Sequence, residues 1–302
     1  MANNNLEHML EKRTQARQII KDMNIGAWII LVEDNDAEKV HLSLIGATDD
    51  SKGIVYVLTP TRAVAVCGHL EASKQREYGF EVIEATGRDN LEPLVKNLAA
   101  IIGEDQTDPI ALNYSHEFGS IDTLGHGNYV KITKAIVDAG YSAKTEPDRL
   151  FTSADQLIMR IASTKLPFEI KLLREAAELT DKVLREAFQQ IRTGMSEKNV
   201  GDIVHSIAKR YMSKDKRVGY SWPESHNPIV LTGKGIEDSP HAAPSDRVIE
   251  QGSTVYIDFG LSISGYTGDL QHIGYVLKNG ETAAPPEVQK MYDVLVSSIQ
   301  AG

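Results

Sequence analysis

The stretch that most constrains the fold is Thr254–Leu277, because it holds two aspartates inside an otherwise strand-like pattern. Val255, Ile257 and Phe259 alternate with more polar residues, and a period of two is typical of a half-buried strand. A serine-containing turn closed by Gly265 follows, and the chain then returns in a second apolar-rich run. The stretch therefore predicts a β-hairpin.

The register of this hairpin decides how Asp258 and Asp269 are related. If the turn is centred between Ile263 and Ser264, the two aspartates lie directly opposite each other. The same register pairs Gly260 with Thr267 and Tyr256 with Gln271. Directly opposed residues have Cβ atoms roughly 4.5–5.5 Å apart, and like charges placed there repel.

Four interpretations of the aspartate pair follow. One carboxylate holds a proton, and the pair works as an acid/base dyad. A nearby lysine or arginine neutralises the pair. A divalent cation lies between the two carboxylates, since hard cations take oxygen ligands. The remaining interpretation is a solvated hairpin edge with two unrelated aspartates.

Length and composition restrict the class of protein. The chain has 302 residues, which is too long for one small core and predicts about two domains. The net charge of −10 disfavours nucleic acid as a partner. The chain has no run of 18 apolar residues, so the sequence predicts no membrane span. The polar N-terminus lacks the apolar core of a signal peptide. The single cysteine, Cys67, lies in an apolar run, which predicts a buried structural thiol and a cytoplasmic location.

The first half of the chain alternates short apolar runs with helical patterns, which predicts an α/β domain over residues 1–150. The predicted helices are Leu6–Met23, Leu70–Tyr78, Leu91–Ile102 and Tyr129–Ala139. The predicted strands are Ala27–Val32, Leu42–Ile45, Ile54–Leu58, Ala63–Val66, Phe80–Ala85 and Ile110–Asn113.

The pattern loosens near residues 143–156, and a second domain is expected over residues 151–302. A long helix is predicted over Pro167–Arg192, with proline in its first turn and Gly194 after its end. Ser196 is suited to N-cap the next helix. A third helix is predicted over Glu287–Ile299.

Two of the nine histidines, His226 and His241, stand upstream of the acidic hairpin in irregular stretches beside proline. Functional residues often lie on such loops, so these histidines and the aspartates are candidates for one site. His205 is interpreted as structural, and His126 as part of a loop or cap. No nucleotide-binding glycine pattern, HExxH motif or nucleophile elbow is found.

These residues carry a resemblance. Asp258-Phe-Gly260, followed by Gly265-Tyr266 and Asp269, resembles the first metal-ligand pair of the creatinase, aminopeptidase P and prolidase family of "pita-bread" metallopeptidases. Residues 161–176, 192–197 and 225–230, together with His241, are similar to further segments of that family. The first half resembles the N-terminal domain of the creatinase and prolidase branch, which favours proline-specific members. The resemblance implies an α/β N-terminal domain followed by an α+β pita-bread domain that is truncated.

The resemblance also implies a mechanism. Asp258 would bind one divalent metal ion and Asp269 would bridge two, with Mn, Co or Zn as the metals. A metal-bridged hydroxide would attack the bond before proline in short peptides. His241 would stabilise the intermediate or carry a proton, and His226 would lie on the substrate side. Family members commonly pair, so a homodimer is expected.

One departure from the family is large. The family completes its site with one histidine and two glutamates downstream of the hairpin, but no histidine follows His272 here. The acidic residues after Asp269 are Glu281, Glu287 and Asp293, in a predicted turn or helix. Gln271 and His272 also stand where many relatives carry threonine and arginine. We therefore expect the chain as given to be inactive, and two alternatives stay open: a non-catalytic binding or assembly protein, and a metal-free hydrolase of the creatinase type.

Overall fold

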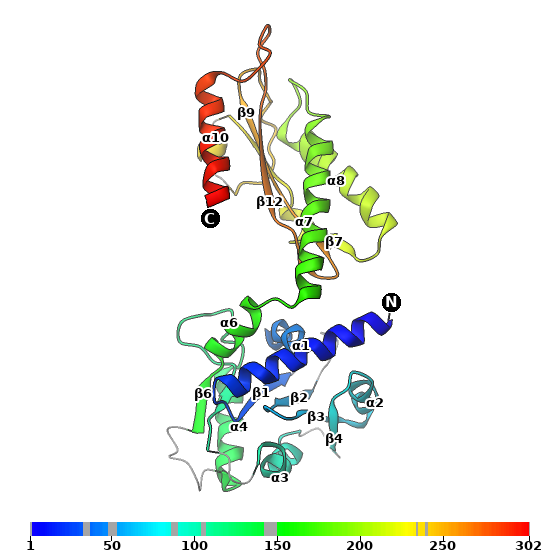
Figure 1. The fold of residues 1–302 in the computed structure, drawn as a ribbon, viewed down its shortest axis with the longest axis vertical. Helices are drawn as coiled ribbons and strands as arrows, with labels where there is room; N and C mark the ends of the chain where they lie inside the picture. The colour runs from blue at the N-terminus through cyan, green and yellow to red at the C-terminus, as the bar shows by residue number, and fades with distance from the viewer. Residues whose placement is uncertain are drawn as a thin grey trace. The chain divides into compact units, whose positions relative to one another are not determined.

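The structure is a computed structural model that describes residues 2–32, 37–47, 53–85, 90–103, 107–141, 150–233, 235–238 and 241–301. The chain forms two compact units, Met1–Leu166 and Pro167–Gly302 (Figure 1). Within the described residues, no helix is long and apolar enough to cross a membrane.

The first unit is built on a six-stranded sheet in the order β4-β3-β2-β1-β5-β6. The β1–β2 and β2–β3 pairs are antiparallel, and the β3–β4, β1–β5 and β5–β6 pairs are parallel. The strands are β1 (Ala27–Val32), β2 (Ile54–Leu58), β3 (Ala63–Gly68), β4 (Glu81–Ala85), β5 (Ile110–Leu112) and β6 (Phe151–Ser153). The helices are α1 (Ala2–Asp22), η1 (Ala37–Ile45), α2 (His69–Glu77), α3 (Leu91–Ile102), α4 (His126–Asp138) and α6 (Asp155–Ser163).

Strand β1 is buried on both faces, because apolar residues occupy all six of its positions. Trp28 and Ile30 join the core formed with α1, η1 and α6, whereas Ile29 and Leu31 join the core formed with α3 and α4. A strand between two helical layers reads as a continuous apolar run. The α/β prediction for the first half is therefore confirmed.

Two predictions in the first unit are wrong in detail. Leu42–Ile45 is not a strand but the end of the 3-10 helix η1. Two of its buried residues, Leu42 and Ile45, are three positions apart, and residues at that spacing share one side of a 3-10 helix. The boundary expected between residues 150 and 151 also differs from the observed one, because β6 pairs with β5 and α6 packs against α1.

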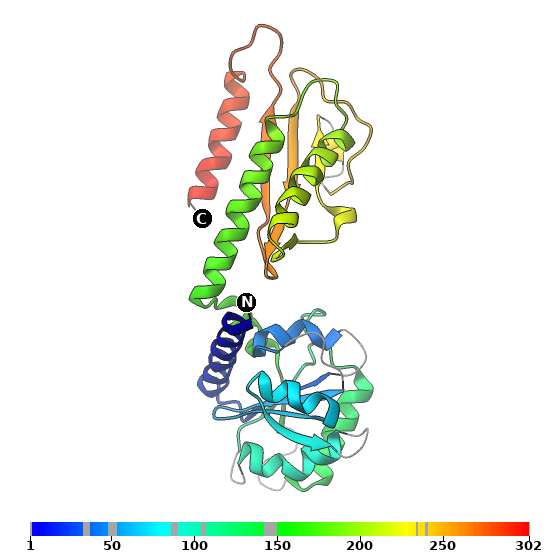
Figure 2. The same ribbon diagram turned by 90° about the vertical axis from the view of Figure 1, so that its right-hand side faces the viewer.

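The second unit packs two helices, α7 (Pro167–Phe188) and α8 (Glu197–Lys214), against short strands (Figure 2). The strands form two three-stranded sheets, β12-β9-β8 and β11-β10-β7. They are β7 (Val218–Tyr220), β8 (Ile229–Thr232), β9 (Thr254–Phe259), β10 (Leu261–Ile263), β11 (Tyr266–Thr267) and β12 (Leu270–Tyr275). The remaining helices are η3 (Glu224–His226), α9 (Gly235–Asp238) and α10 (Pro286–Ala301).

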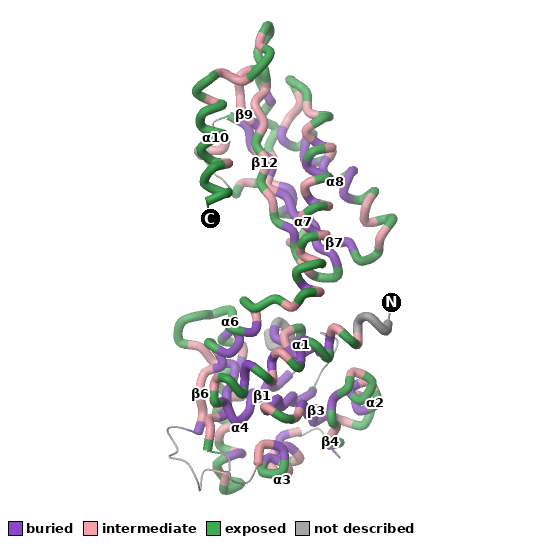
Figure 3. The backbone as a smooth tube through the Cα atoms, in the orientation of Figure 1, coloured by how far each residue is buried: buried purple, intermediate pink, exposed green. Residues whose placement is uncertain are grey.

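The two faces of β9 differ in burial. Val255, Ile257 and Phe259 are buried in the core with α7 and α8, and the alternate residues are only partly buried. In Figure 1 the strands lie between α8 and α10, and Figure 3 shows α10 exposed along its length. The polar face of β9 is thus open to solvent at several positions. Ser196 caps α8 in a capping box with Asn199, as the sequence predicts.

The predicted hairpin forms, but its register differs from the predicted one by two residues. Ser264 and Gly265 both have positive φ, at 52° and 84°, and make the two-residue turn. A type I′ turn requires positive φ at both central residues, which favours glycine at the second position. The centre of the hairpin therefore lies one residue later than expected, so Asp258 faces Gln271 and Tyr256 faces Ile273. Thr267 faces Ser262.

Candidate functional site

The side chain of Gln271 joins the two candidate carboxylates. Its Nε2 donates a hydrogen bond to Asp258 Oδ1 at 3.0 Å and another to Asp269 Oδ1 at 3.1 Å. Gln271 lies directly opposite Asp258 in the ladder between β12 and β9, and Asp269 precedes it by two residues on the same face. The prediction that the aspartates oppose each other is wrong, but the prediction that they share a face is confirmed.

Partial burial affects the acidity of Asp258. Burial raises the pKa of the Asp258 carboxyl, and the negative charge of Asp269 raises it further. Hydrogen bonds from Gln271 and Tyr256 and the charge of His241 act in the opposite direction. Burial also raises the pKa of Tyr256 to about 12, and the neighbouring carboxylate of Asp258 contributes. Tyr256 therefore stays protonated at neutral pH and can donate to Asp258, at 3.5 Å.

His241 is exposed, and it is close enough to Asp258 for its charge to lower the pKa of that carboxyl. The segment that carries His241 runs from Thr232 to Ser245, and both of these residues are hydrogen-bonded to the side chain of Glu197. Glu197 is buried, with 2% of its surface exposed. Glu197 accepts hydrogen bonds from Thr232 N at 2.8 Å, Ser245 N at 3.0 Å and Ser245 Oγ at 2.6 Å. One carboxylate at the start of α8 thus fixes both ends of the segment that carries His241.

His226 lies on a neighbouring loop. Hydrogen bonds anchor this loop to Gly260, which follows β9, and to Gly268, which precedes Asp269. Ser221 Oγ donates to Gly268 O at 2.8 Å, and Asn227 Nδ2 donates to Gly260 O at 2.9 Å. The ring Nδ1 of His226 is 2.9 Å from Ser225 Oγ. The loop is therefore held beside the aspartate strands, while the His226 side chain bonds within its own loop.

Helix α8 supports both histidine loops. Pro228 and Pro244 each have an atom within 4 Å of the position that a Cβ on Gly201 would occupy. One turn further along, His205 Nδ1 is 2.9 Å from Tyr220 Oη. Lys209 forms an ion pair with Glu224 of η3 at 2.8 Å. Glu197, Gly201, His205 and Lys209 recur every four residues, so one stripe of α8 organises these loops.

His272 belongs to the opposite face of the hairpin, as its position beside Gln271 predicts. Its Nε2 is 3.1 Å from Asp181 Oδ1 on α7, and its ring lies 6.2 Å from that of Phe188. Burial lowers the pKa of His272, against the charge of Asp181. His272 therefore attaches β12 to α7 and does not contribute to the carboxylate face.

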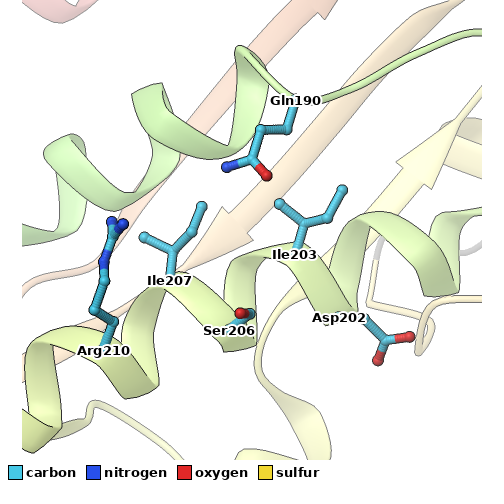
Figure 4. Close-up of a pocket in the computed structure, with 6 residues that line it drawn as sticks. All are labelled: Gln190, Asp202, Ile203, Ser206, Ile207 and Arg210. Carbon is cyan, nitrogen blue, oxygen red and sulfur yellow. The ribbon is translucent and has the colours of Figure 1, made fainter.

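A surface pocket of about 390 Å³ lies apart from these residues, between the end of α7 and the outer face of α8 (Figure 4). It is lined by Gln190, Asp202, Ile203, Ser206, Ile207 and Arg210. Arg210 is already engaged with Glu186. Neither aspartate of the hairpin and neither loop histidine lines this pocket, so the candidate site is the carboxylate face.

The carboxylates fit a divalent cation in chemistry but not in number. Oxygen donors suit such ions, and Asp258 and Asp269 present two carboxylates to one amide group. Within the described part of the chain, no three histidine, cysteine, aspartate or glutamate residues come together as a metal-binding group. The two carboxylates alone are therefore too few to enclose a divalent cation. Sequence reasoning missed the bridging role of Gln271 and the clamp by Glu197, because both depend on contacts between separate elements.

Comparisons with known proteins find a family that is similar to the second half of the chain. Residues 171–302 match the model of Metallopeptidase family M24. An uncharacterized peptidase of Staphylococcus aureus strain MSSA476 is 28% identical over 155 residues, which cover 50% of this chain and 40% of the relative. This chain thus matches less than half the length of such curated relatives.

The fold is shared with solved structures of two peptidases and of one domain from a FACT complex subunit. The X-Pro aminopeptidase of Thermotoga maritima MSB8 has a TM-score of 0.64 at 22% identity, over 91% of this chain and 69% of that one. The Xaa-Pro dipeptidase of Bacillus anthracis has a TM-score of 0.63 at 20% identity, over 95% and 69%. The N-terminal domain of the FACT complex subunit SPT16 from chickpea, Cicer arietinum, has a TM-score of 0.60 at 14% identity, over 98% and 71%.

The fold and the matched domain define the class: a two-unit protein of the pita-bread peptidase type. Residues 171–302 of its second unit are similar to Metallopeptidase family M24. The resemblance stated from Asp258, Asp269 and the surrounding segments is therefore confirmed.

Proposed function

We propose that the protein is a metal-dependent peptidase that hydrolyses Xaa-Pro bonds in short peptides. The observation that carries the proposal is the pair of carboxylates, Asp258 and Asp269, which share the open face of an M24 domain. The similarity to an X-Pro aminopeptidase and an Xaa-Pro dipeptidase supports this substrate class. A cytoplasmic, homodimeric enzyme is part of the same proposal.

The residues of the site have distinct roles in this proposal. Asp258 would hold one divalent ion and Asp269 would hold two, with Mn, Co or Zn as the ions. When bound, such a pair of ions activates water and polarises a carbonyl group. His241, whose charge acts on Asp258, would move a proton at the substrate, and His226 would contact the substrate from the neighbouring loop. Two carboxylates do not complete such a site, so the 302-residue chain alone is proposed to be inactive.

A paired assay tests the proposal. The chain is compared with a fusion that adds the part of the Thermotoga maritima X-Pro aminopeptidase that this chain does not match. Both are incubated with Mn²⁺ and Xaa-Pro dipeptides and tripeptides, and products are measured by mass spectrometry. We expect hydrolysis by the fusion, none by the chain alone, and none by the fusion with Asp258→Asn. A folded, Mn²⁺-loaded fusion that leaves every peptide intact would refute the peptidase; hydrolysis insensitive to EDTA would instead indicate a metal-free hydrolase.

A second candidate function is supported by one observation. The same fold occurs in a domain of a FACT complex subunit, so this architecture is also found in an assembly component. A non-catalytic binding protein would keep the fold and have no need of the cation. Such a protein would show no loss of partner binding on Asp258→Asn, whereas the fusion described above would lose peptidase activity by several orders of magnitude.

A further inference from the structure

The two carboxylates of the hairpin already accept hydrogen bonds from a neutral group of the chain itself. Gln271 Nε2 has two hydrogens, and both are used, one on Asp258 and one on Asp269. The reversed amide would point its carbonyl oxygen at two acceptors, which is repulsive, so the donor assignment is set by the carboxylates. The amide nitrogen therefore occupies one oxygen of each carboxylate, and a cation held by the same two oxygens would have to displace it.

The position of Gln271 in the sheet makes this contact local and reversible. Gln271 is directly opposite Asp258 and two positions from Asp269. Its side chain can therefore bond to both carboxylates without any change of the backbone. The side chain is exposed, and it can rotate into solvent without leaving a cavity. Hydrogen bonds to charged groups contribute more than those between neutral groups, so the bridge opposes any ligand of the same oxygens.

We propose that Gln271 sets the cation affinity of this site by competing, through its side-chain amide, for the Oδ1 atoms of Asp258 and Asp269. The inference rests on the proposed function, since it assumes that these carboxylates are the cation ligands. In the metal-free protein the amide keeps the like charges together. When a divalent cation binds, the amide is displaced and the glutamine turns outward.

The test measures Mn²⁺ binding to the 302-residue chain from the electron paramagnetic resonance signal of the free ion. The variants are Gln271→Ala and Gln271→Thr, of which threonine is the better strand former and guards against loss of fold. Gln251→Ala is the matched control, because Gln251 is an exposed glutamine of the same unit that bonds to Asn279. Circular dichroism checks that each variant is folded.

We expect both Gln271 variants to lower the Mn²⁺ dissociation constant roughly tenfold, which corresponds to about 1.4 kcal/mol. Gln251→Ala should leave the constant unchanged, and adding Asp258→Asn should abolish the gain. An unchanged constant would overturn the competition, and a raised constant would make Gln271 a ligand instead. If Mn²⁺ binds neither the parent nor the variants, or if Asp258→Asn has no effect, the two carboxylates of this chain hold no cation and the inference is overturned. The proposed function fails only if the fusion with the added peptidase segment also binds no Mn²⁺ through Asp258.

A metal-free measurement gives an independent check. The side-chain amide resonances of Gln271 should shift on Asp258→Asn in the presence of EDTA, and they should move toward the position of an exposed glutamine when Mg²⁺ is added as a diamagnetic ion. Resonances that respond to neither change would show that the bridge is not populated in solution, which would overturn the inference without reference to activity.

Discussion

Asp258 lies directly opposite Gln271, and Asp269 is reached only diagonally, through the glutamine amide. Directly opposed carboxylates would repel at short range, whereas diagonal positions are roughly 7–8 Å apart. The shift of one residue in the turn centre is what separates them. The site is thus an acidic pair whose two members are joined by the Gln271 amide.

Removing the charge of Asp258 should stabilise the metal-free protein at neutral pH. The pKa of Asp258 is raised above its ordinary value of 3.8, so the native state binds the proton more tightly than the unfolded state. Stability is therefore lost as pH rises from 3.8 through the native pKa. Asp258→Asn should raise the melting temperature at pH 7 in EDTA, by a few degrees at most, with no gain at pH 3.

Asp293→Asn, at an exposed position of α10, is the control for this experiment. A gain at pH 3 as large as the gain at pH 7 would contradict the assignment of the effect to ionised Asp258. Melting is followed by circular dichroism at both pH values.

Glu197→Gln should loosen the segment that carries His241. Glu197 accepts three hydrogen bonds from Thr232 and Ser245, and an amide offers one acceptor oxygen in place of two. A buried group left without its partner costs about 1–3 kcal/mol. Amide hydrogen exchange over residues 241–249 should therefore become roughly 10–100 times faster. Glu178→Gln, at an exposed position of α7, should leave exchange there unchanged; equal acceleration in both variants would argue against a clamp.

Gly268→Ala should destabilise the second unit. A Cβ at residue 268 would lie 2.7 Å from the backbone of Ala176 on α7, and neither element can move without disturbing the core. Overpacking of this kind costs about 1–3 kcal/mol. Gly201→Ala is the matched change, since its Cβ would meet only Pro228 and Pro244 at 3.6–3.9 Å and alanine favours the helix. Urea unfolding should separate the two variants; equal stability would refute the close approach.

His41 should make the first unit sensitive to mild acid. It is 2% exposed, and burial lowers its pKa from 6.5 to about 4. The native state thus disfavours the charged ring, and stability falls as pH drops below 6.5 until the native pKa is reached. Between pH 7.5 and pH 5 the loss should be about 2 kcal/mol.

His41→Leu should remove most of this loss. A Trp222→Phe background leaves Trp28, in the core of the first unit, as the one tryptophan, because the chain has two. Urea unfolding followed by its fluorescence at pH 7.5 and pH 5 gives the difference. An equal acid loss in His41→Leu and the parent would assign it to other groups.

Local patterns were sufficient for most elements. The apolar runs of β1 and β2, the cap at Ser196 and the helix that begins at Pro167 depend on neighbouring residues, and each is found as predicted. Leu42–Ile45 was assigned wrongly because a short apolar run fits a strand and a 3-10 turn equally well. The aspartates and their shared face were likewise available from Thr254–Leu277, and the family resemblance from that stretch together with residues 161–176, 192–197 and 225–230 and His241.

The amino-acid pattern therefore specifies the class of fold, the hairpin and the residue types of its site. Tertiary structure alone decided the register. The observed turn is centred between Ser264 and Gly265, one residue later than the predicted centre between Ile263 and Ser264. This shift changes the partner of every strand residue by two positions. It also decided that Gln271 bridges the carboxylates and that Glu197 closes the His241 segment. Such contacts join residues on different strands and helices, and their geometry exists only once those elements have packed.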